Sequence, residues 1–147
     1  MIPKDLKEFL KLLNSHKVEY LLVGGHAVGY HGYPRATGDM DIWIACNEKN
    51  AQLVANVLVE FGFDIPGVDK NTFLQKNKIF RMGNIPVRIE LLTTISGVEF
   101  YNCYKNRIED EIDGVPVKII NLNDLIINKR ASGRNKDLDD LEKLNQF

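Results

Sequence analysis

The 147-residue sequence has few features of a secreted, membrane-spanning or polyanion-binding protein. Its two cysteines, Cys46 and Cys103, lack the spacing of a metal motif and indicate buried, reduced thiols. No apolar run approaches membrane-spanning length, and the first residues contain no apolar signal region. The formal net charge of −1 gives no general attraction to nucleic acid or to an anionic membrane. We therefore expect a cytoplasmic protein, and we favour a small-molecule substrate or a localised binding patch over a long polynucleotide substrate.

The composition is that of an ordinary globular chain. Hydrophobic residues make up 44% and charged residues 27%, which is enough for a normal core. No internal repeat, low-complexity tract or linker divides the chain. We therefore expect a single domain over residues 1–147.

The apolar periodicity predicts an α/β (α+β) fold in which helices pack on a mixed β-sheet. Two strand pairs have hairpin-like turns, at Gly83-Asn84 and at Asp113-Gly114. Helices are expected from Pro3, at 26–31, from Asn47 to Gly62, at 98–106, and in a closing region of about 122–147 (123–132 and 136–145); strands are expected at 18–23, 40–45, 78–82, 86–92, 108–112 and 115–120.

A glycine pair, Gly24-Gly25, ends the apolar run Tyr20–Val23 and precedes the expected helix at 26–31. Glycines at such a junction allow backbone N–H groups to approach an anion closely. The pattern is compatible with a phosphate-binding turn and also with an ordinary tight turn.

Two carboxylates, Asp39 and Asp41, begin the next apolar run, Ile42-Trp43-Ile44. Residues two apart in a strand share a face, so both side chains project together. Like charges this close repel unless a cation neutralises them, and hard oxygen ligands suit Mg²⁺. The alternative is a solvated strand end. Trp43 shares this face, where it can stack on a base or pack in the core.

Glu90 is a third acidic residue, in the alternating strand at 86–92. If this strand lies beside the strand of Asp39 and Asp41, three carboxylates converge and can hold two ions roughly 3.5–4 Å apart, as in two-metal phosphoryl-transfer sites. The alternative is that Glu90 pairs across a strand with Arg88 or Lys78.

Two segments together carry a family resemblance. Val23-Gly24-Gly25-His26-Ala27, followed by Arg35-Ala36-Thr37-Gly38-Asp39-Met40-Asp41-Ile42, resembles the signature of the polymerase-β-type nucleotidyltransferase superfamily, whose fold is palm-like. The nearest types are small bacterial nucleotidyltransferases related to lincosamide and aminoglycoside nucleotidyltransferases and to abortive-infection toxins. The resemblance covers the first half of the chain, and residues 129–137 resemble a segment that recurs in these proteins.

The resemblance implies a metal-dependent transfer of a nucleoside monophosphate from an NTP, expected to be ATP, to an acceptor hydroxyl, with release of pyrophosphate. It implies two Mg²⁺ or Mn²⁺ ions. The implied metal ligands and catalytic residues are Asp39, Asp41 and Glu90; the implied nucleotide-binding residues are Gly24, Gly25, Arg35, Thr37, Lys129, Arg134 and Lys136. Gly25 stands where the superfamily more often has serine.

Some interpretations stay open at this level. The basic run from Lys129 to Lys136 contacts phosphate or is a solvated helix end, with Arg130 on the surface and Asp137 pairing locally with Arg134. A catalytically silent binding protein, such as a toxin–antitoxin partner or nucleotide sensor, is the alternative function. The acceptor (small molecule, protein or RNA end) is undetermined, and a homodimer or a helical partner protein could complete its pocket.

Overall fold

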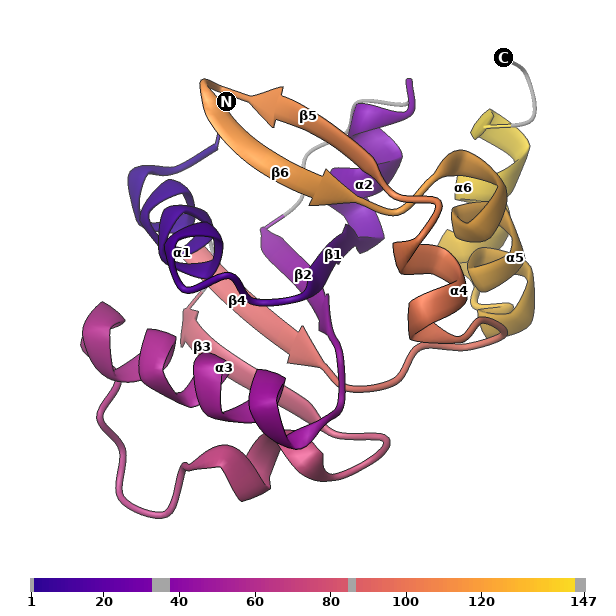
Figure 1. The fold of residues 1–147 in the computed structure, drawn as a ribbon. Helices are drawn as coiled ribbons and strands as arrows, with labels where there is room; N and C mark the ends of the chain where they lie inside the picture. Colours follow the sequence, from indigo (N-terminus) through magenta and orange to yellow (C-terminus); the bar gives the residue numbers. More distant parts are fainter. Residues whose placement is uncertain (1, 33–37, 85–86, 145–147) are drawn as a thin grey trace.

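The computed structural model of the protein describes residues 2–32, 38–84 and 87–144. Its centre is a six-stranded sheet in the order β3-β4-β2-β1-β6-β5 (Figure 1). The strands are β1 (Tyr20–Val23), β2 (Asp39–Ile44), β3 (Ile79–Asn84), β4 (Val87–Leu92), β5 (Ile108–Ile112) and β6 (Val115–Ile119). The helices are α1 (Lys4–Ser15), α2 (Gly24–Tyr30), α3 (Glu48–Phe61), α4 (Phe100–Tyr104), α5 (Leu122–Ser132) and α6 (Asn135–Leu144), with a 3₁₀ helix at Lys70–Leu74.

The sheet is mixed, as the periodicity predicts. β2 runs parallel to β4 and β1 runs parallel to β6, whereas the remaining neighbours are antiparallel. Parallel pairing of β2 and β4 places the start of both strands at the same edge of the sheet. The expected α/β fold is therefore confirmed, and both expected strand pairs are antiparallel neighbours. The turn expected at Gly83-Asn84 is wrong, because these residues belong to β3 and pair with Arg88 and Val87.

α1 and α3 pack together on one side of the sheet (Figure 1). The apolar stripe of α1, formed by Leu6, Phe9, Leu10 and Leu13, is buried. Phe9 meets Phe61 of α3 edge to face, with ring centroids 5.1 Å apart. The Asn47 side chain accepts the backbone N–H of Asn50 at 2.9 Å and caps α3. These contacts anchor the helical layer that supports the sheet.

Element boundaries differ from the sequence expectation where a local cap decides them. β1 begins at Tyr20 rather than Val18, because the Val18 N–H donates to Leu13 O at 3.0 Å and closes the end of α1. α4 begins at Phe100 rather than Val98, because the Glu99 side chain accepts the N–H groups of Tyr101 and Asn102. Such side-chain caps move a helix end by one or two residues without changing its apolar pattern.

Trp43 and Cys103 are buried in the core, whereas Cys46 is exposed. Trp43 is buried and packs edge to face on Phe100 with centroids 5.0 Å apart, so it belongs to the core. Cys103 is buried as expected, but the expectation that Cys46 is buried is wrong. Cys46 follows the end of β2 at Ile44, and its exposed thiol lies within 3.5 Å of Phe73 O.

Within the described ranges, no helix is both long and apolar enough to cross a membrane.

Candidate active site

The pairing of three strands brings the predicted acidic residues together on one sheet face. Asp41 of β2 lies opposite Glu90 of β4, which in turn lies opposite Arg81 of β3. One row earlier, Asp39 lies opposite Arg88. The two strands that carry the carboxylates are therefore neighbours, which is the condition that the sequence left open. Residues paired in this way share a face, so the row of Asp41 and Glu90 forms a cross-strand acidic pair.

Gly24 creates the space that Asp41 occupies. An ideal Cβ on Gly24 would lie 2.2 Å from Asp41 Oδ2, closer than any real side chain could tolerate. Gly24 also has φ of +68°, in the left-handed region that favours glycine. The glycine at the start of α2 therefore serves the close packing of this carboxylate against the backbone, and any larger residue would displace one of the two.

One oxygen of the Asp41 carboxylate is unsatisfied. Among the residues that the structure describes, its Oδ1 is buried and has no hydrogen-bond partner. Burial, reinforced by the neighbouring Glu90 and Asp39 carboxylates, raises the pKa of Asp41 to about 7. A buried oxygen atom with no donor is uncommon in a folded protein and calls for a cation or another ligand.

Arginines neutralise the other two carboxylates. Arg88 forms a bidentate pair with Asp39, with Nε–Oδ1 at 3.0 Å and Nη2–Oδ2 at 2.8 Å. Arg81 Nε donates to Glu90 Oε1 at 3.0 Å, and Arg88 Nη2 lies 3.7 Å from the same oxygen. The sequence alternative in which Glu90 pairs with Arg88 is thus partly realised, and Arg81 is its closer partner.

The acidic residues fit a divalent cation only in part. In the described portion of the chain, no group of three or more His, Cys, Asp or Glu side chains is arranged to hold a metal ion. Asp41 and Glu90 nevertheless provide adjacent carboxylate oxygens, and Asp41 Oδ1 is left without a donor. This oxygen donor set suits Mg²⁺, which commonly takes one or two carboxylates and completes its shell with water and phosphate.

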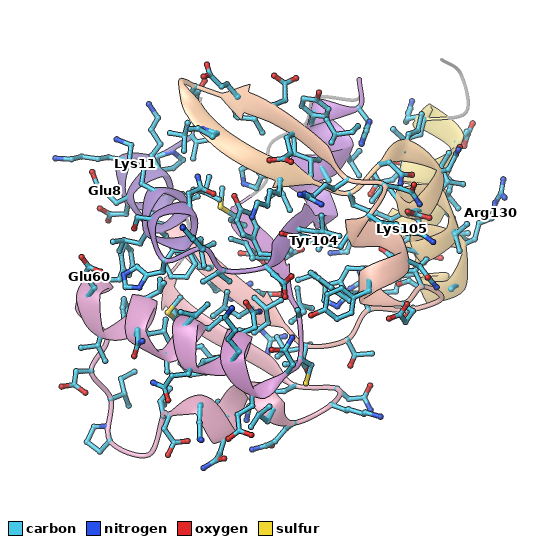
Figure 2. The ribbon with its side chains drawn as sticks, viewed as in Figure 1. Glu8, Lys11, Glu60, Tyr104, Lys105 and Arg130 are labelled. Carbon is cyan, nitrogen blue, oxygen red and sulfur yellow. The ribbon has the colours of Figure 1, made fainter. Side chains whose placement is uncertain are left out.

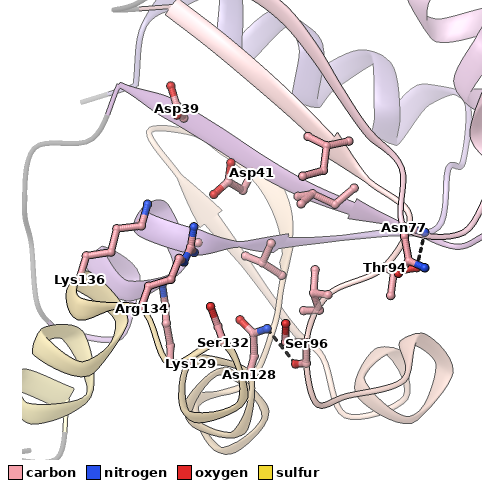
Figure 3. A pocket seen from close by; sticks show the side chains of 16 residues that line it. Asp39, Asp41, Asn77, Thr94, Ser96, Asn128, Lys129, Ser132, Arg134 and Lys136 are labelled. Carbon is pink, nitrogen blue, oxygen red and sulfur yellow. Dashed lines mark hydrogen bonds between the residues drawn. The ribbon is translucent and has the colours of Figure 1, made fainter.

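The carboxylates border a pocket of about 520 Å³. Gly24, Gly25, Asp39 and Asp41 line one side, and residues of the α5–α6 segment line the other (Figure 3). Glu90 lies beside Asp41 in the sheet but does not contribute to the pocket wall.

Two of the predicted cations, Arg134 and Lys136, reach this pocket directly. Both side chains are directed towards the region of Asp41 in Figure 3. They come from the junction between α5, which ends at Ser132, and α6, which begins at Asn135. Gly133 makes the turn with φ of +65°. One wall of the pocket is therefore acidic and the facing wall is basic.

Lys129 also lines the pocket, but its ammonium is already engaged. Its Nζ lies 3.0 Å from Asp137 Oδ1 and 3.3 Å from Asp140 Oδ2, and all three residues are buried. Asp137 pairs with Arg134 at 2.8 Å, which confirms the expected local contact. The sequence did not reveal that Asp137 accepts hydrogen bonds from both Lys129 and Arg134. Arg130 projects outward from the molecule (Figure 2), as expected.

Some pocket residues had no sequence signal, and some predicted residues cannot be placed. Asn77, Thr94, Ser96 and Asn128 line the pocket, but isolated amides and hydroxyls in loops and on a helix have no recognisable spacing. Arg35 and Thr37, both predicted to bind nucleotide, lie outside the described residues.

Several solved structures resemble this fold, including one from Thermotoga maritima and one from Paracoccidioides brasiliensis. A Thermotoga maritima protein assigned provisionally as a nucleotidyltransferase has a TM-score of 0.63 at 17% identity, covering 97% of this chain and 91% of its own. An antigenic nucleotidyltransferase-like protein of Paracoccidioides brasiliensis has a TM-score of 0.55 at 16% identity, covering 94% of this chain and 72% of its own. Identities this low establish similarity of fold alone.

A comparison with curated proteins finds no match. The family described as "Nucleotidyl transferase of unknown function (DUF2204)" matches residues 3–147, which is nearly the whole chain. The nucleotidyltransferase-like fold and this match agree with each other. The chain therefore belongs to the DUF2204 family of nucleotidyl transferases of unknown function.

Proposed function

We propose that the protein transfers a nucleoside monophosphate from an NTP to an acceptor hydroxyl and releases pyrophosphate. One observation carries the proposal: Asp41, whose buried Oδ1 has no hydrogen-bond partner among the described residues, lies beside Glu90 and faces Arg134 and Lys136 across one pocket. Acidic residues that recruit a cation and basic residues that bind an anion are the two requirements of phosphoryl-transfer chemistry.

Asp41, Glu90 and Asp39 would hold Mg²⁺ or Mn²⁺, in a site of two ions. When bound, these ions supply charge neutralisation at the transferred phosphate and lower the pKa of the attacking hydroxyl. For Asp39 to take part, its carboxylate must exchange the bidentate contact with Arg88 for a different ligand. Gly24 keeps the Asp41 carboxylate close to the start of α2.

Arg134 and Lys136 would bind the triphosphate, together with the backbone at Gly24 and Gly25. A guanidinium offers paired N–H donors that match phosphate oxygens, and a lysine adds a point charge. Asp137 accepts from Arg134 Nε at 2.8 Å and, at the longer distance of 3.5 Å, from Nη2, so Nη1 is the nitrogen through which the guanidinium would chiefly meet a phosphate. Arg35 and Thr37 are proposed to act from the loop beside the site. Lys129 is proposed to assist from behind, since its ammonium bonds to Asp137.

A catalytically silent relative is the second candidate. Gly25 provides no hydroxyl where serine is more usual, and Arg88 occupies Asp39 in a bidentate pair. A protein that keeps this pairing would bind nucleotide through its cations without turnover. We also propose that the protein is related to the lincosamide and aminoglycoside nucleotidyltransferases and to the abortive-infection toxins. In each case a homodimer or a helical partner protein could complete the acceptor pocket.

The test is calorimetric titration of the purified protein with ATP, in Mg²⁺, in Mn²⁺ and in EDTA. We expect binding that requires the metal and that Asp41→Asn abolishes. Asp64→Asn, an exposed aspartate outside the pocket, is the matched control and should bind like wild type. Asp41→Asn should also fold at least as stably as wild type, because it removes a buried carboxylate from two like charges.

Two results would change the assignment. Metal-independent ATP binding that survives Asp41→Asn would favour the silent binding protein. The absence of ATP binding under every metal condition would sink the transferase proposal.

A further inference from the structure

The sheet face that carries the carboxylates changes from charged to apolar along its strands. Beyond the row of Asp41 and Glu90, the next row on this face places Leu92 of β4 beside Ile79 of β3. Both residues line the pocket, and Ile79 is 44% exposed. An apolar floor therefore begins two residues from Glu90, a separation of about 7 Å along a strand.

This end of the pocket, the neutral arm, comprises Ile79, Leu92, Thr94, Ile95 and Asn128. The charged residues described in the pocket wall lie elsewhere: Asp39 and Asp41 are on β2, and the cations are on α5 and at the α5–α6 junction. Figure 3 shows Arg134 and Lys136 at one end of the pocket and Thr94 at the other, with Asp41 between them. The pocket is thus polarised, and an uncharged group would occupy the neutral arm.

Asn128 presents a hydrogen-bond acceptor to this arm. Its Nδ2 donates to the backbone carbonyl of Ser96 at 3.0 Å. Because a carbonyl can only accept, the contact fixes which way the amide is turned. Oδ1 is then the atom left on the pocket side (Figure 3).

Thr94 presents a hydrogen-bond donor. Its Oγ1 accepts the backbone N–H of Asn77 at 3.1 Å, so its own hydroxyl proton is available to a ligand. The neutral arm therefore combines an aliphatic floor with one acceptor and one donor at its rim. This chemistry matches a flat heterocycle that carries an amino group and a ring nitrogen.

We propose that the neutral arm binds the base of the NTP, with Asn128 Oδ1 accepting from an exocyclic amino group and Thr94 donating to a ring nitrogen. The proposal rests on the function proposed above. With the α-phosphate at Asp41 and Glu90 and the outer phosphates at Arg134 and Lys136, the base lies one ribose away in the other direction, over Leu92. Adenine and cytosine carry this amino and ring-nitrogen pattern; hypoxanthine and uracil carry a carbonyl and an N–H instead.

The test uses matched nucleotide pairs that differ only in this pattern. ATP is compared with ITP, and CTP with UTP, by calorimetry in Mg²⁺, and inorganic tripolyphosphate probes the cationic end alone. We expect the amino-bearing member of each pair to bind roughly three- to tenfold more tightly, the effect of about one neutral hydrogen bond. Tripolyphosphate, which has no base, should bind to the cationic end alone.

Substitutions of Asn128 and Thr94 test whether these residues cause the preference for amino-bearing bases. Asn128→Ala should reduce the ATP/ITP ratio, with the remaining preference due to Thr94, and leave tripolyphosphate binding unchanged, whereas Asn123→Ala, an exposed asparagine on the same helix, should behave like wild type. Because Asn128 also ties α5 to Ser96, Thr94→Val gives an independent reading at an exposed position and should weaken ATP and CTP binding.

The outcomes separate the two proposals. If tripolyphosphate binds but ITP and UTP bind as well as their partners, or Asn128→Ala and Thr94→Val leave the ratios intact, the base-binding role is wrong and the phosphate site stands. If neither tripolyphosphate nor any NTP binds, the nucleotidyltransferase proposal itself fails, and the proposed base-binding role of the neutral arm fails with it.

Discussion

At the scale of single residues, the site depends on Gly24, because the lack of a side chain there leaves room for the Asp41 carboxylate. Asp41 Oδ2 lies 2.2 Å from where a Cβ of Gly24 would be, and no described residue forms a hydrogen bond with its Oδ1. The alternation of β2 predicted that Asp39 and Asp41 share a face, and the sheet confirms it. The steric role of Gly24 could not be predicted, because it depends on how closely the start of α2 approaches the neighbouring strand.

We expect Gly24→Ala to destabilise the protein by roughly 1–3 kcal/mol and to weaken ATP binding, because the new methyl group must displace Asp41. The measurement is urea unfolding at pH 7, with calorimetry on the folded variant. Gly114→Ala is the control: Gly114 also has positive φ, at +81°, but nothing lies within 4 Å of its Cβ position. Equal losses for both variants would show that backbone strain alone is responsible and that the Asp41 contact is unimportant.

At the scale of elements, the turn between α5 and α6 is organised around one buried carboxylate. Asp137 Oδ2 accepts from Ser132 at 2.6 Å and from Arg134 at 2.8 Å, and Oδ1 accepts from Lys129 at 3.0 Å. Burial opposes ionisation of Asp137, but these donors outweigh it and hold the pKa of the carboxyl well below its usual range. The basic end of the pocket is thus positioned from within the helical pair.

We expect Asp137→Asn to lower the free energy of unfolding at pH 7 by roughly 3 kcal/mol, because a buried lysine loses an ionic partner. Asp139→Asn, an exposed neighbour on α6, should cost little. Since the folded pKa of Asp137 is lowered, its contribution is fully present above the unfolded pKa of about 3.9 and is lost as the pH falls from there towards the folded pKa. Urea unfolding should therefore show a wild-type advantage that is unchanged from about pH 7 to pH 5 and shrinks between about pH 4.5 and pH 2. A constant difference would contradict an ionised, stabilising Asp137.

Elements were more predictable from sequence than the pairings between them. Both antiparallel strand pairs were found because their alternation is local, and α3 because Asn47 and Gly62 mark its ends. Of the two expected turns, Asp113-Gly114 is confirmed, whereas Gly83-Asn84 continues β3. The pairing of β2 with β4 joins residues 49 positions apart, such as Asp39 and Arg88, and no local signal encodes it. Arg88 was placed on the face of Glu90, but its bidentate contact with Asp39 became visible only with the strand order.

At the scale of the whole molecule, the charge is nearly balanced and the cations are local. The net charge is −1, while Arg134 and Lys136 converge on one pocket. Such an arrangement attracts a small polyanion to a defined place without producing a basic surface.

We expect the protein to bind tripolyphosphate in 150 mM salt and to show no measurable affinity for a fluorescently labelled double-stranded RNA in the same buffer, because polynucleotide binding depends on many phosphate contacts. Fluorescence anisotropy provides the measurement, with a basic RNA-binding protein as positive control. Tight, salt-sensitive binding of the RNA would contradict a polyanion site that is confined to this one pocket.

The Arg–carboxylate pairs across β2, β4 and β3 also have a consequence for folding. Moving β4 by two residues relative to β2 would set Glu90 beside Asp39 in one direction, or beside the buried Trp43 in the other. A one-residue shift would turn Ile89 and Leu91 out of the core. Both kinds of misalignment are costly, so the charges that serve the pocket also select a single strand register while the sheet assembles.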